Sequence, residues 1–255
     1  MFPLHLFGLL YAVRKDAVKE EMKMRLDKYI SNYAGLSRKE ARQAVRGGLV
    51  AVDGVEAVLE SMRVETEQTV TLTGSVIQAE LYVYYMMNKP SGVITATKDA
   101  RQKTVLDLMP VQKREIFPVG RLDKDTEGLL ILTDDGGLAH QLLSPANHVE
   151  KVYEVTYEGK LDKNAVEIFS QGMDIGEKRL TKPARLELIG PGKAKLTISE
   201  GKFHQVKRMF ATCGASVTEL KRTAFAGLLL DEMLAPGKYR KLAEWEIEKL
   251  KAGGR

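Results

Sequence analysis

The spacing of apolar residues predicts two helices near the start of the chain. Between Met24 and Gly35, which ends the first helix, three apolar residues recur at helical spacing: Leu26, Ile30 and Tyr33. We expect the second helix to begin after Ser37, because Glu40 three residues later completes a capping box. Gly47-Gly48 ends this second helix.

Beyond the second helix the apolar pattern is mostly that of strands. Residues 49–52 and 69–73 alternate as short strands, and Asp53-Gly54 is typical of a tight hairpin turn. The apolar run 81–87 predicts a buried strand, followed by a turn at 88–92. Further extended segments are expected at 93–95, 129–133, 152–157, 184–189, 194–198 and 217–220, and helices at 138–143, 163–171, 203–213 and 244–251. Because strands outnumber helices and do not alternate with them strictly, we predict an α+β fold with a mixed, mainly antiparallel sheet in the larger part.

The first 23 residues have a different pattern. Residues 1–13 are mostly apolar but too short to span a bilayer, and residues 15–23 are highly charged. We therefore expect residues 1–23 to form an extension outside the fold, with Met22 and Met24 as alternative start sites. A short amphipathic helix that binds a membrane or a partner is the other interpretation.

Composition narrows the protein class but does not identify a partner. The 255 residues are 44% hydrophobic and 29% charged, as in ordinary globular proteins, and the net charge of +5 favours an anionic partner. A single cysteine, Cys213, excludes an intrachain disulfide. The four histidines and this cysteine do not have metal-ligand spacing, so we expect no metal site.

Basic residues are concentrated in the two predicted helices. Residues 23–50 hold seven basic and two acidic residues, whereas residues 51–74 hold one basic and five acidic residues. Arg38, Arg42 and Arg46 fall four apart and share one helix face with Lys39 beside them. Such a face can neutralise phosphates, although charge alone favours a solvated surface face.

A loop with two aspartates precedes the apolar strand at 129–133. Asp123 and Asp125 lie in a glycine-bounded loop within the segment 118–136. Burial beside an apolar strand raises the pKa of a carboxyl group unless a cation lies close to it. Asp123-Lys124-Asp125-Thr126 also fits the DxDxT motif of aspartyl phosphatases, but that motif follows a buried strand, whereas here the apolar run comes after it.

A basic helix face is a candidate source of that cation. In the predicted helix 203–213, His204, Lys207 and Arg208 lie beside an apolar face. Residues 195–222 hold six basic and two acidic residues. We expect either a positively charged row facing a cleft or a core helix with a solvated basic side.

Two parts of the chain resemble known families. The stretch RLDKYISNYAGLSRKEARQAVRGGLVAVDG resembles the S4 RNA-binding domain. GRLDKDTEGLLILTDDG, KVYEV, LTISEGKFHQVKRMF and the NKPSG turn together resemble the pseudouridine synthase superfamily, and are most like its small-subunit rRNA pseudouridine synthase A branch. The resemblance implies an S4-like domain at 24–75 and a catalytic domain at 81–250.

The resemblance also implies roles for individual residues. Asp123 takes the place of the catalytic aspartate, which acts at C1′ or C2′ of the ribose. Tyr153 takes the place of the active-site tyrosine, Lys207 that of the basic residue paired with the aspartate, and Arg121 that of the residue filling the space of the flipped base. RNA contacts are expected from the following residues: Arg38, Lys39, Arg42, Arg46, His204 and Arg208.

The implied function is isomerisation of one uridine to pseudouridine in small-subunit (16S) rRNA, without a cofactor or metal. The implied partner is ribosomal RNA, free or in an assembly intermediate, and we expect a cytoplasmic bacterial monomer. Large-subunit rRNA or tRNA is the alternative substrate for the same chemistry. A non-catalytic RNA-binding assembly factor is the alternative from another class.

Overall fold

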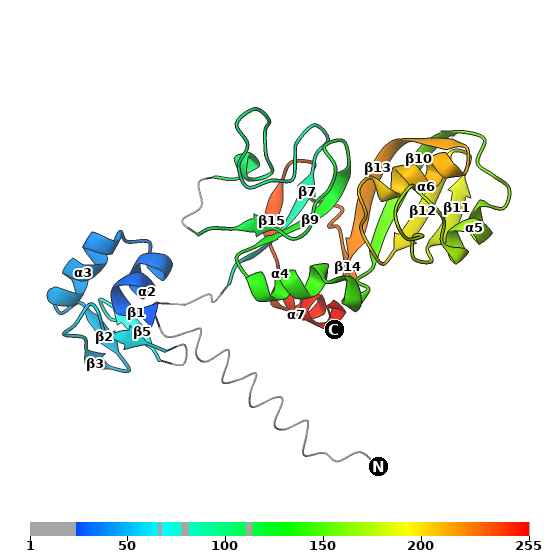
Figure 1. Cartoon of the computed structure of the whole chain (residues 1–255). Helices are drawn as coiled ribbons and strands as arrows, with labels where there is room; N and C mark the ends of the chain where they lie inside the picture. Colours follow the sequence, from blue (N-terminus) through cyan, green and yellow to red (C-terminus); the bar gives the residue numbers. More distant parts are fainter. Residues whose placement is uncertain (1–23, 66–67, 78–81, 111–113, 255) are drawn as a thin grey trace, which may run out of the picture. The chain divides into compact units, whose positions relative to one another are not determined.

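A computed structural model describes residues 24–65, 68–77, 82–110 and 114–254 (Figure 1). The chain divides into two compact units, Met1–Leu81 and Tyr82–Arg255, and each is described here by itself. The extension expected at 1–23 lies outside the described residues, so its structure stays a prediction. The expected domain limits at 75 and 81 likewise stay predictions.

In the first unit, two helices share a core with a small antiparallel sheet. The helices are α2 (Leu26–Tyr33) and α3 (Arg38–Arg46). The sheet has the strand order β3-β2-β5-β6, and β1 pairs separately with β4. The strand bounds are β1 Met24–Arg25, β2 Val50–Val52, β3 Val55–Glu56, β4 Arg63–Val64, β5 Val70–Leu72 and β6 Ser75–Val76.

The predicted capping box is present at the start of α3. Glu40 N donates to Ser37 Oγ at 3.2 Å, and Ser37 N donates to Glu40 Oε2 at 2.7 Å. These two bonds satisfy backbone donors that the first helical turn leaves unpaired. Ala41, Ala44 and Val45 then face the core, so the basic residues of α3 remain on its outer side.

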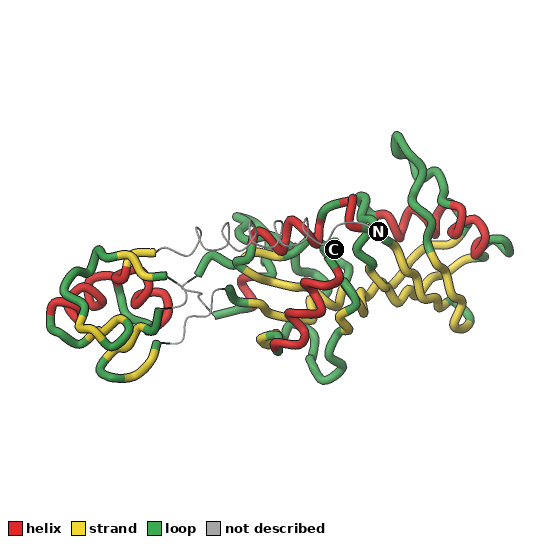
Figure 2. The backbone as a smooth tube through the Cα atoms, turned by 90° about the horizontal axis from the view of Figure 1, so that it is seen from below, coloured by secondary structure: helices red, strands yellow, loops and turns green. Residues whose placement is uncertain are grey.

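The second unit is built on one nine-stranded sheet with the path β11-β12-β10-β13-β9-β7-β15; off this path, β14 pairs with β13 and β8 pairs with β9. The parallel pair is β13 with β9, and every other strand pairing described in this sheet is antiparallel. The prediction of a mixed, mainly antiparallel sheet is therefore confirmed. Figure 2 shows the strands in yellow. The strand bounds are β7 Tyr84–Lys89, β8 Phe117–Pro118, β9 Glu127–Thr133, β10 Lys151–Gly159, β11 Arg185–Gly190, β12 Lys193–Ile198, β13 Ala215–Phe225, β14 Leu228–Leu229 and β15 Tyr239–Lys241.

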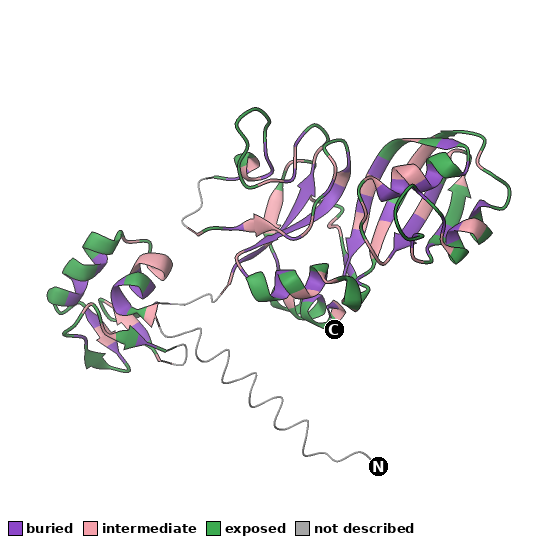
Figure 3. Cartoon of the chain, in the orientation of Figure 1, coloured by how far each residue is buried: buried purple, intermediate pink, exposed green. Residues whose placement is uncertain are grey.

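Two pairs of helices pack on different parts of the sheet. The helix α4 (Gly136–Leu143) lies beside α7 (Glu244–Gly253), whereas α5 (Ala165–Gln171) packs on β11 and α6 (Gln205–Thr212) packs on β13 (Figure 1). Short 3-10 turns occur at Leu106–Leu108 and Pro145–Asn147. Along β9, Leu129 and Ile131 contribute to one core and Leu130 and Leu132 to the other. This alternation explains the uninterrupted apolar run, which is coloured as buried in Figure 3.

Several predicted boundaries were wrong. The helix expected at 203–213 begins at Gln205, because His204 adopts a left-handed conformation with φ 48°. The strand expected at 217–220 extends over Ala215–Phe225. The extended segment expected at 93–95 forms only an isolated bridge between Ile94 and Thr104. Among the described residues, no helix is long and apolar enough to cross a membrane.

Candidate active site

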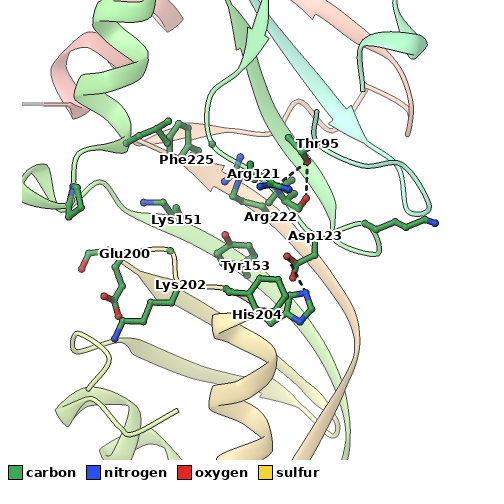
Figure 4. Close-up of a pocket in the computed structure, with 18 of the residues that line it drawn as sticks. Thr95, Arg121, Asp123, Lys151, Tyr153, Glu200, Lys202, His204, Arg222 and Phe225 are labelled. Atoms are coloured by element: carbon green, nitrogen blue, oxygen red, sulfur yellow. Dashed lines mark hydrogen bonds and ion pairs between the residues drawn. The ribbon is translucent and has the colours of Figure 1, made fainter. Parts of the chain in front are cut away.

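A cavity of about 780 Å³ lies in the second unit, and its walls come from segments far apart in the sequence. They are the loop before β9, the end of α4, the start of β10, the loop from β12 to α6, and β13 (Figure 4). Its charged and aromatic lining includes Arg121, Asp123, Lys151, Tyr153, His204 and Arg222. Three residues from separate predicted motifs, Asp123, Tyr153 and His204, therefore meet in one concave site.

The loop that carries Asp123 is held in place by Lys89, the last residue of β7. Lys89 is fully buried, and its ammonium donates to the carbonyl oxygens of Pro90 at 3.1 Å, Lys124 at 3.2 Å and Thr126 at 2.8 Å. Burial lowers the pKa of Lys89 to about 8, although the carboxylates of the same loop oppose this shift. The lysine therefore holds the backbone directly after Asp123.

A second anchor lies directly before Asp123. The buried Thr95 hydroxyl donates to the carbonyl oxygen of Leu122 at 2.8 Å and accepts from its amide at 3.1 Å. The amide of Thr126 donates to the carbonyl oxygen of Asp123 at 3.1 Å, which closes a turn around the aspartate. The carboxylate of Asp123 is thus presented by a backbone that is held on both sides.

Replacing Lys89 with methionine tests this anchor. We expect Lys89→Met to lower the free energy of unfolding by about 2 kcal/mol or more, because three carbonyl oxygens lose their donor. The measurement is urea unfolding followed by circular dichroism. Lys98→Met, at an exposed lysine, is the control and should leave the midpoint unchanged. An unchanged midpoint for Lys89→Met would contradict the anchoring role.

Two basic side chains lie near the Asp123 carboxylate. His204 Nε2 is 3.7 Å from Asp123 Oδ1, and Lys207 Nζ is 3.8 Å from Asp123 Oδ2. Lys207 makes its hydrogen bond to Asp125 Oδ1 at 2.5 Å, and this bond lowers the pKa of Asp125. Lys207 therefore lies between the two carboxylates and is not paired with Asp123 alone.

The predicted basic helix face is wrong for His204. This residue precedes α6, and its Nε2 lies 3.7 Å from Asp123 Oδ1 (Figure 4). Arg208 donates to the carbonyl oxygen of Ile175 at 2.9 Å and to Glu177 Oε1 at 2.7 Å. Arg208 is not among the residues that line the cavity, and its side chain is 28% exposed.

Tyr153 and Arg121 approach the cavity from different elements. Tyr153 lies on β10 with 8% of its surface exposed, and the bulge between Val152 and Tyr153 interrupts the register with β13. Arg121 precedes Asp123 in the loop and is exposed. Figure 4 shows Tyr153 between Asp123 and Lys151, so the aromatic ring forms part of the cavity wall.

Arg222 is a buried lining residue that the sequence analysis missed. Its Nε donates to the carbonyl oxygen of Leu129 at 2.8 Å, its guanidinium lies 4.8 Å from the centroid of the Phe225 ring, and its Nη2 has no hydrogen-bond partner. Burial lowers the pKa of Arg222, and the Tyr153 hydroxyl beside it opposes this shift. The strand β13 continues to Phe225, and along it Leu220, Arg222 and Ala224 alternate as buried residues. This alternation points to Arg222 only when the strand is extended beyond Leu220.

Lys151, at the start of β10, is a second missed lining residue. Its ammonium donates to the carbonyl oxygen of Val149 at 2.5 Å. Burial lowers the pKa of Lys151 to about 8, and the charges of Arg222 and Lys182 add to this shift. The KVYEV motif contains this lysine two residues before Tyr153, which was a usable signal. Lys151 and Arg222 make this part of the cavity wall positively charged.

The arginine face of the first unit is organised by a buried acid. Asp27 accepts from Arg42 Nε at 3.0 Å and from Arg25 Nε at 3.2 Å, and lies 3.6 Å from Arg38 Nη2. Burial acts to raise the pKa of Asp27, but the hydrogen bonds from Arg25 and Arg42 outweigh it, so the pKa is lowered. Arg46 forms its ion pair with Glu60 at 2.5 Å. These arginines are still about half-exposed or more, so the face keeps an excess of positive charge.

Within the described residues, no group of three or more histidine, cysteine, aspartate or glutamate side chains is placed to hold a metal ion. The site as described consists of one central aspartate, nearby basic groups and an aromatic wall.

The chain matches two protein families. Residues 83–212 match the family described as RNA pseudouridylate synthase, and residues 24–70 match the S4 domain. An uncharacterized RNA pseudouridine synthase of Bacillus subtilis (strain 168) is 46% identical over 89% of this chain and 98% of the relative. The ribosomal small subunit pseudouridine synthase A of Escherichia coli (strain K12) is 44% identical over 88% of this chain and 98% of the relative.

A solved structure agrees with these sequence relationships. A crystal structure of a pseudouridylate synthase superposes with a TM-score of 0.63 and is 38% identical in sequence. The match covers 89% of this chain and 99% of the crystallised chain. The similarity therefore extends over both units of the chain.

Proposed function

Because the chain belongs to the RNA pseudouridylate synthase family, we propose that it converts a specific uridine of small-subunit ribosomal RNA to pseudouridine. The observation that carries the proposal is a cavity in which Asp123 and Tyr153 meet, with Lys207 3.8 Å from the aspartate. The small-subunit substrate rests on the similarity to the Escherichia coli relative over 88% of the chain. The reaction is an isomerisation, so atoms are neither gained nor lost.

Asp123 carries the central step at the ribose. The bond between C1′ and N1 of uracil breaks, the base turns, and a bond forms between C1′ and C5. The proton on C5 leaves, and N1 gains one. Asp123 acts either as a nucleophile at C1′ or as a base at C2′, and both roles need its ionised form. Lys207 places its ammonium group 3.8 Å from Asp123 Oδ2, next to this carboxylate.

Tyr153 and Arg121 handle the displaced base. The Tyr153 ring, on the cavity wall, stacks on the flipped uracil, and its hydroxyl is positioned to move a proton. Arg121 fills the space that the uracil leaves in the RNA stack, and it is exposed and free to reach outward. Taking a base out of a stack costs a few kcal/mol, which these contacts offset.

The first unit contributes RNA affinity. Arg38, Lys39, Arg42 and Arg46 form the face on α3 that contacts RNA phosphates, with Asp27 fixing the orientation of Arg38 and Arg42. In the second unit, His204 and the positively charged wall at Lys151 and Arg222 contact the substrate. Arg208, which is partly exposed and ion-paired with Glu177, is a further RNA contact in this proposal.

The triple variant Arg38→Ala, Arg42→Ala and Arg46→Ala tests the α3 face. We expect weaker RNA binding and a slope of log K against log salt that is shallower by about two, because fewer counterions are released. Binding is measured by fluorescence anisotropy at several salt concentrations, with circular dichroism to verify that the fold is kept. Arg63→Ala, on β4 of the same unit, is the control. An unchanged slope for the triple variant would remove α3 from the RNA interface.

The partner is ribosomal RNA, free or in an assembly intermediate, and the protein acts as a cytoplasmic monomer. The test is to map pseudouridines in rRNA and tRNA from a deletion strain with and without the restored gene. Loss of one small-subunit pseudouridine supports the proposal. Loss in large-subunit rRNA or tRNA keeps the chemistry but changes the substrate, and no loss overturns the enzymatic function.

A further inference from the structure

Phe203 is an exposed aromatic residue on the rim of the catalytic cavity. It has 73% of its surface exposed, yet it lines the same cavity as Asp123. Its ring stacks on the ring of His204, with centroids 3.8 Å apart and an angle of 19° between the planes. One face of Phe203 is thus covered by His204, and the high exposure of the ring leaves apolar surface open to a ligand.

The loop that carries Phe203 is fixed by hydrogen bonds on both sides. The Lys202 amide donates to Gln205 Oε1 at 2.9 Å, and Gln205 Nε2 donates to Glu200 Oε1 at 3.0 Å. The Lys202 ammonium donates to the carbonyl oxygens of Arg179 at 2.7 Å and Leu180 at 2.9 Å. Phe203 is therefore presented by an ordered loop, and a ligand does not have to pay for ordering it.

His204, the other ring of the stack, lies next to the catalytic aspartate. His204 has a left-handed backbone, which is uncommon for a residue other than glycine, and its Nε2 lies 3.7 Å from Asp123 Oδ1. This backbone conformation lets the imidazole contact Phe203 on one side and Asp123 on the other. The exposed ring is thus built into the site next to the reacting atoms.

We propose that Phe203, supported by His204, is a stacking platform for a nucleobase adjacent to the target uridine. Bases provide the flat aromatic surface that a single exposed ring accepts, and stacking on aromatic side chains is a common way to hold splayed-out RNA. The positively charged wall at Lys151 and Arg222 of the same cavity suits a polyanionic strand better than an apolar protein surface. This inference rests on the proposed function, and it adds a contact at the rim of the cavity that holds the reacting uracil.

The experiment measures the binding of single-stranded oligouridylates to Asp123→Asn protein, which removes turnover. The probes are an eight-nucleotide oligouridylate and a matched strand with abasic sites on both sides of one central uridine. We expect Phe203→Ala to weaken binding of the first probe about 5- to 150-fold, and Phe203→Tyr or Phe203→Trp to retain it. Phe203→Leu should bind as weakly as Phe203→Ala, because leucine is apolar but cannot stack as a ring does.

The abasic probe separates stacking from other effects. With this probe we expect the Phe203→Ala variant and the protein with the wild-type Phe203 to bind with equal affinity, because no neighbouring base is left to stack. Trp245→Ala removes another exposed aromatic, 60% exposed on α7, and should change nothing. Equal binding of Phe203→Ala and Phe203 to the full oligouridylate overturns the platform. That result would leave the pseudouridine mapping unaffected, so the two proposals fail separately.

Discussion

Asp123→Asn is expected to abolish pseudouridine formation while leaving RNA affinity within about twofold of the wild type. Asparagine keeps the shape of the side chain but is neither a nucleophile nor a base, so the loss should be on the order of 10⁴-fold or more. The backbone around residue 123 is held by Lys89 and Thr95, which do not depend on the carboxylate. The loss should therefore come from chemistry and not from misfolding.

The neighbouring Asp125 provides a matched control. It belongs to the same loop, is 67% exposed in its side chain, and hydrogen-bonds Lys207. Asp125→Asn removes a similar charge two residues away and should keep activity within about tenfold. The measurement is the rate of tritium release from [5-³H]uridine-labelled small-subunit rRNA, alongside anisotropy for binding. If Asp123→Asn kept full activity, or if only Asp125→Asn were inactive, the central role would belong to Asp125.

Local patterns in the sequence predicted the parts of the fold that depend on local contacts. The capping box at Ser37 and Glu40 satisfies backbone groups three residues apart, so the sequence contains all the information needed. The apolar run in β9 is equally readable, because a strand covered on both faces needs no polar alternation. Both features were predicted within one or two residues.

Features that depend on distant contacts could not be predicted. The left-handed backbone of His204 depends on a loop held by Glu200 and Gln205, and it moved the start of α6 by two residues. The parallel pairing of β13 with β9 joins residues almost a hundred positions apart and buries Arg222 in the cavity wall. A strand that ended at Leu220 gave no reason to consider that arginine.

Charge patterns located the basic surfaces but not the partners of each charge. The spacing of Arg38 and Arg42 correctly placed them on one face, but only the fold shows that both lie at the buried Asp27. In the same way, Lys207 was expected beside Asp123, and the structure places it between Asp123 and Asp125. Pairing depends on three-dimensional distances, which periodicity along a helix does not contain.

Gly128→Ala is expected to be severely destabilising, because this glycine lies where β9 meets β13. Its φ is +101°, which side chains rarely adopt, and a Cβ atom would overlap the backbone of Arg222, including its amide nitrogen at 2.9 Å. The unusual φ and the overlapping atoms both belong to the backbone, so no side-chain rotation can relieve them. We expect the free energy of unfolding to fall by at least about 4 kcal/mol, or the soluble yield to collapse.

The same substitution at Gly136 separates this clash from a general effect of losing a glycine. Gly136 begins α4, has open space where a Cβ would be, and does not have a positive φ. Gly136→Ala should therefore stabilise the protein by up to about 1 kcal/mol, since alanine restricts the unfolded chain and favours a helix. Thermal unfolding of both variants is the measurement. A Gly128→Ala midpoint close to that of the wild type would mean that β9 and β13 can separate without cost. In that case the parallel pair would not hold Arg222 in the cavity wall.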